Sequence, residues 1–501
     1  ARAAGIPVIL GSATPSLESW HASTPQIEGG PGRYRRIVMP YRISAPPRSA
    51  TAPVALPSAG NGTTAAPAPD TRASANTQGV DAGLPRVRLL DMTRQPRGAL
   101  IAPSLLAAIA QRVARGEQAL LLLNRRGYAP VLHCQDCGWK SECPHCSAYR
   151  VFHKFDRTLR CHHCGLTERV PRACPVCGNA DLTLIGRGTE RLEEHLADLL
   201  ADVPAPPRSA AAPAALPIEG APAAGPSQGG GVRILRIDAD AARGAGDLAA
   251  LLAAVHRGEA DVLVGTQMIA KGHDFRRVTL VAAIDPDGLL YSSDFRAPER
   301  LFALLIQAAG RAGRTADTAQ NSEMWVQTAS PGHPLFAALT AHDYPAFAAR
   351  QLAQRAEAGL PPFTHLALLR ADARGAQGQA AAQAFLAAAR DWASVQASRT
   401  MQSPAYETTG PGSEAATAAP KLPPSALPPE VWRQVTWYAP VPLPVARVAN
   451  VERAQLLLES RSRPALQAVL AACAPLLHGL RADKAHRAIV RWAIDVDPLA
   501  M

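Results

Sequence analysis

Eight of the chain's nine cysteines lie in one short segment, where they form four Cys-x-x-Cys pairs. A tight turn that carries two thiolates provides half of a tetrahedral zinc site, so four such turns predict two sites of four cysteines each. Because all eight sulfurs would then be metal ligands, no position remains for a catalytic water, and we expect both sites to be structural. The pairs are Cys134/Cys137, Cys143/Cys146, Cys161/Cys164 and Cys174/Cys177.

Other chemistries fit the four pairs less well than zinc does. Disulfides need an oxidising compartment, and the first residues of the chain do not have the pattern of a signal peptide. A thioredoxin-like redox site would be one pair rather than four. Iron–sulfur ligation stays open as an alternative, although four close pairs suit tetrahedral zinc better. We interpret the ninth cysteine, Cys473, as a buried core thiol, and the nearby histidines as exposed polar residues: His133, His145, His162 and His163.

The net charge of the chain is +11, which favours a polyanionic partner such as nucleic acid. Eight thiolates and two zinc ions would lower this charge to about +7. The segment from His133 to Gly178 holds seven Lys/Arg against four Asp/Glu, so the metal-loaded segment would be close to neutral. We therefore expect it to bind a strand or a protein partner by shape rather than by bulk attraction. The longest apolar run considered, Ala119–Leu123, is far too short to span a membrane.

Apolar strand patterns alternate with helical patterns over much of the chain. Alternation of this kind predicts a mostly parallel sheet with helices on both faces, and ligands in such sheets bind at the carboxyl ends of the strands. The expected strands are Ala119–Leu123, Arg233–Ile237, Asp261–Gly265, Val278–Ile284 and Met324–Thr328, and the expected helices are Ser104–Arg115, Asp247–His256 and Ala297–Ala309.

Three stretches interrupt this pattern, and each is rich in Ala, Pro, Gly, Ser and Thr. They are Ala45–Asn76, Pro204–Gly231 and Ser403–Pro429. Few apolar residues occur in them to offset the entropy of ordering, so we interpret them as insertions in surface loops. The chain also opens on Ile6–Leu10, which has the pattern of a buried strand. This start predicts that the chain is a fragment of a longer protein.

Two signatures lie where we expect ligands, at the carboxyl ends of the strands, and contain residues suited to nucleic acid or phosphate. Gly265–Met268 follows an expected strand and leads to Ala270–His273, whereas Gln307–Arg314 ends an expected helix with two arginines three residues apart. The first could be an ordinary turn, and the second a basic helix end. Glycines beside both arginines favour a phosphate site, because they allow close approach and guanidinium groups match phosphate oxygens.

Several short segments together carry a family resemblance. They are Ser12–Thr14, Leu121–Tyr128, Gly188–Arg191, Gly265–Lys271, Asp294–Arg296, Gln307–Arg314 and Ile494–Pro498. The first, fourth and sixth resemble motifs III, V and VI of superfamily 2 helicases. With the four Cys pairs placed directly after Tyr128, the chain resembles the primosomal protein N′ (PriA) family of replication restart helicases over nearly all of its length outside the insertions.

The resemblance implies an α/β fold: a RecA-like helicase lobe, interrupted by a two-zinc Cys-rich insertion and followed by an α+β C-terminal domain. The implied domains are a remnant of the first lobe (1–43), a low-complexity insertion (44–84), the start of the second lobe (85–132), the zinc module (133–180), the rest of the second lobe (181–330, with the insertion 204–231) and the C-terminal domain (331–501, with the insertion 403–429).

The implied activity is that of an ATP-dependent 3′-to-5′ DNA helicase that recognises stalled forks and restarts replication. Its implied partners are forked and single-stranded DNA, primosome proteins, single-stranded DNA-binding protein and the loader of the replicative helicase, in the bacterial cytoplasm at the nucleoid and without a membrane. Its implied cofactors are two structural Zn²⁺ ions, with ATP and Mg²⁺ in the complete protein.

The resemblance also assigns roles to single residues. Arg311 and Arg314 would face the ATP phosphates, with Arg314 as the arginine finger, and Gln307 would sense nucleotide. Motif V (Thr266, Gln267 and Lys271) would contact or couple to the DNA strand, and Ser12 and Thr14 would link the lobes. The outer Cys pairs (Cys134/Cys137 and Cys174/Cys177) would share one zinc ion and the inner pairs (Cys143/Cys146 and Cys161/Cys164) the other.

Departures from the family pattern limit what this chain can do alone. The sequence has no Gly-x-x-x-x-Gly-Lys-Ser/Thr phosphate loop, and no acidic Mg²⁺ motif precedes Ser12. Arg447–Gln455 is less basic and less aromatic than the corresponding family segment, which weakens its expected grip on DNA. We predict that the chain by itself does not hydrolyse ATP. A zinc scaffold that binds DNA or primosome proteins without a working motor is the second hypothesis.

Overall fold

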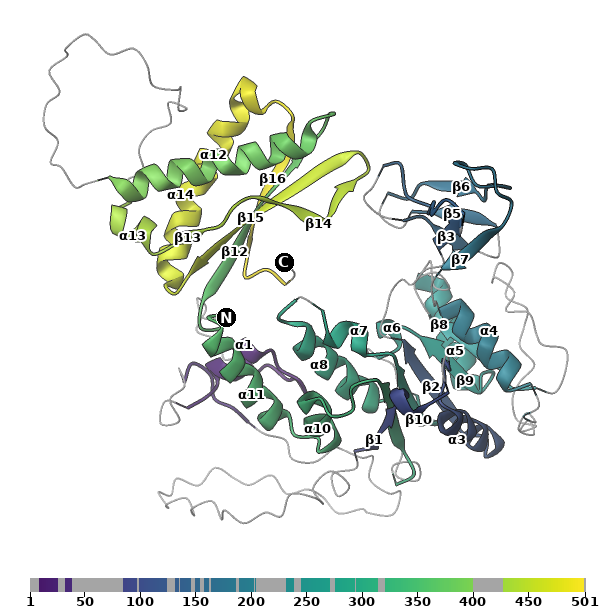
Figure 1. Cartoon of the computed structure of the whole chain (residues 1–501). Helices are drawn as coiled ribbons and strands as arrows, with labels where there is room; N and C mark the ends of the chain where they lie inside the picture. The colour runs from purple at the N-terminus through teal and green to yellow at the C-terminus, as the bar shows by residue number, and fades with distance from the viewer. Residues whose placement is uncertain are drawn as a thin grey trace, which may run out of the picture. The chain divides into compact units, whose positions relative to one another are not determined.

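The fold is described from a computed structural model of the chain, shown in Figure 1. The structure describes residues 9–25, 32–37, 84–96, 99–123, 131–134, 136–145, 149–153, 157–161, 164–185, 189–201, 203, 231–237, 245–270, 275–292, 294–313, 320–399 and 427–499. Contacts divide the chain into two compact units. One comprises residues 1–127 and 187–351, and the other comprises residues 128–186 and 352–501.

The first unit is built around a parallel sheet. Its described strands pair in the order β1-β11-β10-β2-β9-β8, and every neighbouring pair is parallel. Each strand expected for this sheet is present, which confirms the predicted α/β architecture. The strands are β1 (Arg86–Asp91), β2 (Gln118–Leu123), β8 (Ile234–Ile237), β9 (Val262–Gly265), β10 (Val278–Ile284) and β11 (Glu323–Thr328).

Helices cover both faces of this sheet because its strands are apolar on both sides (Figure 1). Along β2, Leu120 and Leu122 enter one core, whereas Ala119 and Leu121 enter the other. The first core contains side chains of α5 (Ala245–Arg257), α6 (Gln267–Ala270), α7 (Asp287–Leu290), α8 (Ala297–Ala309), α10 (Pro334–Thr340) and α11 (Tyr344–Glu357), and the second contains those of α3 (Pro103–Ala114) and α4 (Thr189–Leu199).

The Cys-rich segment is an insertion between β2 and α4. An antiparallel pair, β3 (Val131–Cys134) with β7 (Leu182–Ile185), brings its two ends together. Inside the insertion, β4 (Val151–His153), β5 (Thr158–Arg160) and β6 (Thr167–Arg169) form a small antiparallel sheet. The insertion therefore leaves the first unit at the carboxyl end of the central strand β2 and returns to it through α4.

The C-terminal domain is an antiparallel sheet with helices packed on it. The strands are β12 (His365–Ala373), β13 (Thr436–Trp437), β14 (Val441–Val448), β15 (Val451–Ser460) and β16 (Ile489–Val496), with β12 between β15 and β16. The helices are α12 (Gly378–Ser398), α13 (Pro429–Arg433) and α14 (Arg463–Ala482). This arrangement agrees with the expected α+β domain.

Helix α14 is long and apolar enough to cross a membrane if length and composition alone are considered. In the structure it packs on the sheet of the C-terminal domain, and Leu466, Val469 and Leu477 enter the domain's core. Cys473 is fully buried in the same core, as the sequence predicted. The apolar face of α14 therefore has a partner within its own domain.

Two expectations, a buried strand and a loop insertion, differ from the structure of the described residues. Ile9 and Leu10 were expected in a buried strand, but they lie outside any strand with 90% and 82% of their surface exposed. They are exposed because no described strand pairs with them. Leu427, placed in the third low-complexity stretch, packs against the core of the C-terminal domain, and α13 begins at Pro429. Residues 403–426 of that stretch lie outside the described residues, as do Ala45–Asn76 and residues 204–230.

Candidate metal centres and motor motifs

The outer Cys pairs form one compact group of four sulfurs. The Sγ atoms of Cys134 and Cys177 lie 3.5 Å apart, as do those of Cys137 and Cys174, and all four lie within 4.8 Å of one another. A disulfide would need about 2.05 Å, and all four cysteines are free. Four sulfurs at about 2.3 Å from one zinc ion would be about 3.8 Å apart, so the spacing matches a tetrahedral zinc site.

A second group contains the described inner cysteines. Cys143 and Cys164 have their Sγ atoms 3.7 Å apart, and Cys161 lies with them inside the same 4.8 Å limit. Cys146, the expected fourth ligand, lies outside the described residues. The turn between β14 and β15 reaches this group: Val448 packs against it, and Asn450 N–H donates to the carbonyl of His145 at 2.9 Å.

The outer group fits zinc on electrostatic grounds as well as by distance. Burial would raise the pKa of Cys174, but N–H groups of Cys177 and Val176 donate to its sulfur and lower that pKa to about 7. The N–H of Trp139 favours the thiolate of Cys137, yet desolvation and the neighbouring sulfurs raise its pKa to about 12. Because the Cys174 thiol ionises easily while the Cys137 thiol resists ionisation, this group needs a cation before both can be thiolates.

Three of the four Cys pairs share one turn geometry. In each, the N–H of a glycine donates to the carbonyl of the first cysteine: Gly138 to Cys134 at 3.0 Å, Gly165 to Cys161 at 2.8 Å and Gly178 to Cys174 at 2.9 Å. These glycines have φ between +74° and +78°, where other residues are strained. His133 and His145 are half-buried rather than exposed, and neither joins a sulfur group among the described residues.

Motif V is positioned by the end of a central strand. Gly265 is the last residue of β9, and a Cβ at this position would lie 2.3 Å from the carbonyl oxygen of Ile237 on β8. Thr266 is buried directly after it, and Gln267 is exposed at the start of α6. Lys271 lies outside the described residues. Thr266 and Gln267 are therefore at the carboxyl edge of the sheet, where the sequence placed them.

Motif VI lies at the opposite edge. Gly313 N–H donates to the carbonyl of Val278, the first residue of β10, at 3.1 Å. The expectation that both signatures lie at the carboxyl edge is therefore wrong for motif VI. The reason is that α8, 13 residues long, runs back along the sheet for about 20 Å. Gln307 and Arg311 are half-buried there, with Arg311 Nε 3.4 Å from the carbonyl of Gln307. Arg314 lies outside the described residues.

In motif III, Ser12 and Ala13 are exposed and Thr14 is half-buried. Thr14 N–H donates to Ser12 Oγ at 3.1 Å, which closes a short turn. The next residues, Pro15 and those of α1 (Leu17–Ala22), contact α8 through Arg296 and Glu299 and α11 through Tyr344. Sequence reasoning quoted Asp294–Arg296 for its family resemblance alone and missed this contact, which involves residues nearly 280 positions apart.

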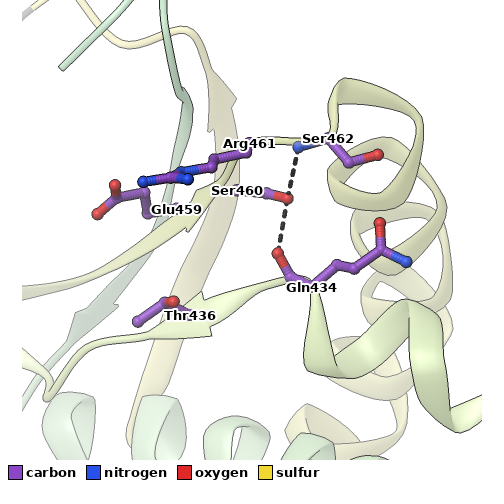
Figure 2. A pocket seen from close by; sticks show the side chains of 6 residues that line it. All are labelled: Gln434, Thr436, Glu459, Ser460, Arg461 and Ser462. Carbon is purple, nitrogen blue, oxygen red and sulfur yellow. Dashed lines mark hydrogen bonds between the residues drawn. The ribbon is translucent and has the colours of Figure 1, made fainter. Parts of the chain in front are cut away.

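One shallow pocket, of about 340 Å³, occurs in the C-terminal domain (Figure 2). It lies where β15 joins α14, and its central hydroxyl, Ser460 Oγ, donates to the carbonyl of Gln434 at 2.7 Å and accepts from Ser462 N–H at 3.0 Å. Glu459 and Arg461 bring opposite charges to its wall. These two bonds already satisfy the Ser460 hydroxyl, which therefore serves to hold the junction of β15 and α14 together.

The fold and these motifs define the second RecA-like lobe of a helicase, with a Cys-rich zinc-ribbon insertion after its central strand and a separate C-terminal domain. Family comparisons agree with each part. Residues 143–169 match the PriA DNA helicase Cys-rich region (CRR) domain, residues 227–316 the helicase conserved C-terminal domain, and residues 356–499 the primosomal protein N C-terminal domain. The chain belongs to the PriA family of replication restart proteins.

Curated relatives show the same relationship. The chain is 37% identical to the replication restart protein PriA of Haemophilus influenzae over 369 residues, which are 74% of this chain and 40% of that protein. It is 32% identical to PriA of Bacillus subtilis over 366 residues, which are 72% of this chain and 36% of that protein. The chain thus spans well under half the length of the curated relatives that it matches.

Proposed function

We propose that this chain provides the second motor lobe, the zinc module and the C-terminal domain of an ATP-dependent 3′-to-5′ DNA helicase that recognises stalled replication forks and restarts replication. The observation that carries this proposal is the insertion of a two-site Cys module at the carboxyl end of β2 in a RecA-like lobe. A helicase that only translocates on DNA has no need of such a module, whereas a PriA-type protein has both parts.

In this function, the arginines of motif VI act on ATP. Arg311 and Arg314 would contact phosphate oxygens, and Arg314 would stabilise the charge that develops as the γ-phosphate bond breaks. Gln307 would sense the bound nucleotide. The half-buried position of Arg311, two residues after the end of α8, supports this role, because a guanidinium anchored next to a packed helix needs little reorganisation when it binds phosphate.

The residues of motif V act on DNA in the same proposal. Thr266, Gln267 and Lys271 would contact the backbone of a single strand and couple its position to the ATP site, while Ser12 and Thr14 would link the two lobes. The support is positional: Gly265 allows β8 and β9 to approach closely, so Thr266 is held firmly at the carboxyl edge. Exposed Gln267 follows at once, within reach of a ligand at that edge.

Zinc would be held by the two sulfur groups. Cys134, Cys137, Cys174 and Cys177 would bind one ion, and Cys143, Cys146, Cys161 and Cys164 the other. Both ions would be structural, since four sulfurs complete a tetrahedral shell. ATP and Mg²⁺ would require a phosphate loop and an acidic motif from another lobe, because this sequence contains neither.

The proposed partners are forked and single-stranded DNA, primosome proteins, single-stranded DNA-binding protein and the loader of the replicative helicase. The proposed location is the bacterial cytoplasm at the nucleoid. The positive charge of the chain supports nucleic acid as a partner, and the restart role of the curated relatives supports the others.

The motor proposal is tested by replacing Arg314 with alanine in a form of the protein that has both lobes. We expect DNA-stimulated ATP hydrolysis to fall about 10³- to 10⁵-fold, while nucleotide binding, measured by fluorescence titration, changes little. Arg257→Ala is the matched control, because Arg257 pairs on the surface with Glu259 at 2.5 Å, outside both motifs. Undiminished turnover in Arg314→Ala would show that the finger is assigned wrongly.

The scaffold hypothesis rests on one observation, the lack of a phosphate loop in these 501 residues. Both hypotheses predict that the chain alone binds DNA without hydrolysing ATP, so they are separated by the two-lobe form. DNA-stimulated hydrolysis in that form supports the motor, and fork binding with no hydrolysis supports the scaffold. Hydrolysis by the 501-residue chain that is lost on Arg314→Ala would contradict our prediction for the isolated chain.

A further inference from the structure

The chain directly after motif III is bound to the motor lobe by specific hydrogen bonds. Tyr344 on α11 donates its hydroxyl to the carbonyl of Pro15. Leu17 N–H donates to Glu299 Oε1 at 3.0 Å, and the Leu17 side chain is fully buried. Leu17 begins α1, so its N–H has no acceptor within that helix. Glu299 thus satisfies a donor that would otherwise need water.

An ion pair reinforces this attachment. Glu18 on α1 pairs with Arg296 at the start of α8, and only 11% of the Arg296 side chain is exposed. The Nε of Arg296 has no hydrogen-bond partner among the described residues. Its backbone N–H donates to Asp294 Oδ1 at 2.9 Å, which fixes the turn that presents the side chain. A guanidinium this buried would lose its principal counter-charge if Glu18 moved away, and leaving such a charge unpaired is costly.

Aromatic packing holds the same segment on its other side. The ring of Trp20 contacts that of Tyr344 edge-on, with centroids 5.0 Å apart. The guanidinium of Arg36 lies 3.5 Å from the Trp20 ring centroid and donates to the Trp20 carbonyl at 2.8 Å. Residues 32–37 therefore fold back over α1. Contacts of three kinds, on α8, on α11 and on the returning chain, fix its position.

Helix α8 connects this attachment to motif VI. Arg296 and Glu299 are at its start, beside the carboxyl edge of the sheet, and Gln307 and Arg311 are at its other end. Seven residues of α8 are buried, and Phe302 stacks on Phe347 of α11 with ring centroids 4.1 Å apart. A helix packed in this way transmits displacement as a rigid rod, because close-packed interiors resist sliding.

We propose that Arg296, Glu299 and Tyr344, which we call the α8 clasp, are positioning residues that make the chain after motif III part of the second lobe. Motif III and motif VI are then connected through α8. A displacement that nucleotide contacts cause at one end of the helix therefore also moves the residues at its other end. The proposal rests on the proposed function for the roles of the two motifs. The clasp itself rests on contacts within the described residues.

The clasp is tested in the 501-residue chain by hydrogen exchange with mass spectrometry. In Glu299→Ala, we expect amides of residues 17–23 to exchange about 10- to 100-fold faster, the worth of one hydrogen bond to a charged group. Glu299→Gln keeps an acceptor oxygen and should recover most of the protection. Glu18→Gln, Arg296→Gln and the double variant form a cycle in which the double variant should add little to either single change.

Glu357→Gln is the control for these variants, because Glu357 is an exposed glutamate on α11 that is not part of the clasp. It should leave exchange in residues 17–23 unchanged. Equal exchange in Glu299→Ala and Glu357→Gln would overturn the clasp. Additive effects of Glu18→Gln and Arg296→Gln would overturn the ion pair as its basis.

Enzyme kinetics in the two-lobe form distinguish a positioning role of the clasp from a role in stability alone. Glu299→Ala should lower kcat for DNA-stimulated ATP hydrolysis about 10- to 100-fold, with KM for ATP unchanged and with recovery in Glu299→Gln. An unchanged kcat, or a rise in KM alone, would overturn the positioning role. If the two-lobe form has no DNA-stimulated ATPase, the proposed function fails, and the exchange experiment still decides whether the clasp exists.

Discussion

Replacing Gly265 with alanine should weaken the motor lobe where β8 and β9 pair. Gly265 lies opposite Ile237 in the parallel register, and an added Cβ would be 2.3 Å from the Ile237 carbonyl oxygen and 2.2 Å from Ile269 Cδ1. Carbon atoms normally keep about 3.5 Å from such neighbours. The Ile269 side chain can rotate away, but the carbonyl is backbone, so the strand ends must separate by about 1 Å.

The magnitude follows from the two consequences of that separation. Overpacking a buried site costs about 1–3 kcal/mol, and weakening the last β8–β9 hydrogen bond costs about 1 kcal/mol more. We therefore expect the free energy of local opening at β8 and β9 to fall by about 2–4 kcal/mol. This effect comes from space alone, because Gly265 does not have a positive φ.

Hydrogen exchange at peptides that cover β8 and β9 measures this opening free energy directly. Gly246→Ala is the matched control: Gly246 is an exposed residue of α5, and a Cβ there would meet nothing within 4 Å. In a helix, alanine is favoured over glycine by up to about 1 kcal/mol, so the control should be neutral or stabilising. Unchanged protection of β8 and β9 in Gly265→Ala, or effects of the same sign in both variants, would refute the steric reasoning.

Three further predictions concern metal, thiol and pH. The purified chain should contain two zinc ions by atomic emission, and Cys137→Ser should reduce this to one while Cys473→Ala leaves it at two; fewer than two ions in the unchanged chain would contradict the paired sites. Burial raises the pKa of Cys473 to about 12, so its peptide should resist a thiol reagent at pH 8 until the chain is denatured, and labelling of the folded chain would contradict a core position. Burial also lowers the pKa of His342, although its ring nitrogen lies 2.9 Å from the Pro85 carbonyl oxygen, which opposes the shift. The neutral ring is favoured in the folded state, so the stability that His342 contributes is present above pH 6.5 and is lost as pH falls below that value. His342→Gln should therefore flatten the pH dependence of the free energy of unfolding measured with urea. An unaltered pH dependence would exclude His342 as its source.

The contacts of α1 suggest how a motor lobe can depend on residues outside its continuous sequence. Leu17 is fully buried although the nearest residues of the lobe's sheet, in β1, lie about 70 positions later in the chain. Its N–H bonds Glu299 of α8, and its neighbours Pro15 and Trp20 contact Tyr344 of α11, in helices that are later still. A shortened chain that begins after Leu17 would therefore leave the α8 clasp exposed to water. Measurements on that chain would describe an altered lobe.

Much of the fold could be predicted because its signals are local. The apolar runs of β2, β9 and β10 and the helical period of α8 are each read within about a dozen residues, and the structure has these elements within a residue or two of the expected bounds. The metal pairs are equally local, since Cys-x-x-Cys is one turn. Gly138, Gly165 and Gly178 adopt the positive φ that each of these turns requires.

The edge at which motif VI lies could not be predicted in the same way. Gln307 and Arg311 were recognised from their own segment, but the length and direction of α8 decide that they lie at the amino end of β10. The contact of Glu299 with Leu17 escaped prediction for a related reason. A single hydrogen bond across 282 positions leaves no periodic pattern in the sequence.

The sequence by itself determined the types of part in this protein: parallel strands, four thiolate turns and glycine–arginine signatures. It did so because backbone conformation and metal-ligand turns depend on near neighbours. Only the tertiary structure decided which parts meet, such as Cys134 with Cys177, Leu17 with Glu299, and motif VI with the start of β10. Those contacts depend on how whole helices and strands pack. Close packing selects one arrangement from the many that the same local patterns allow.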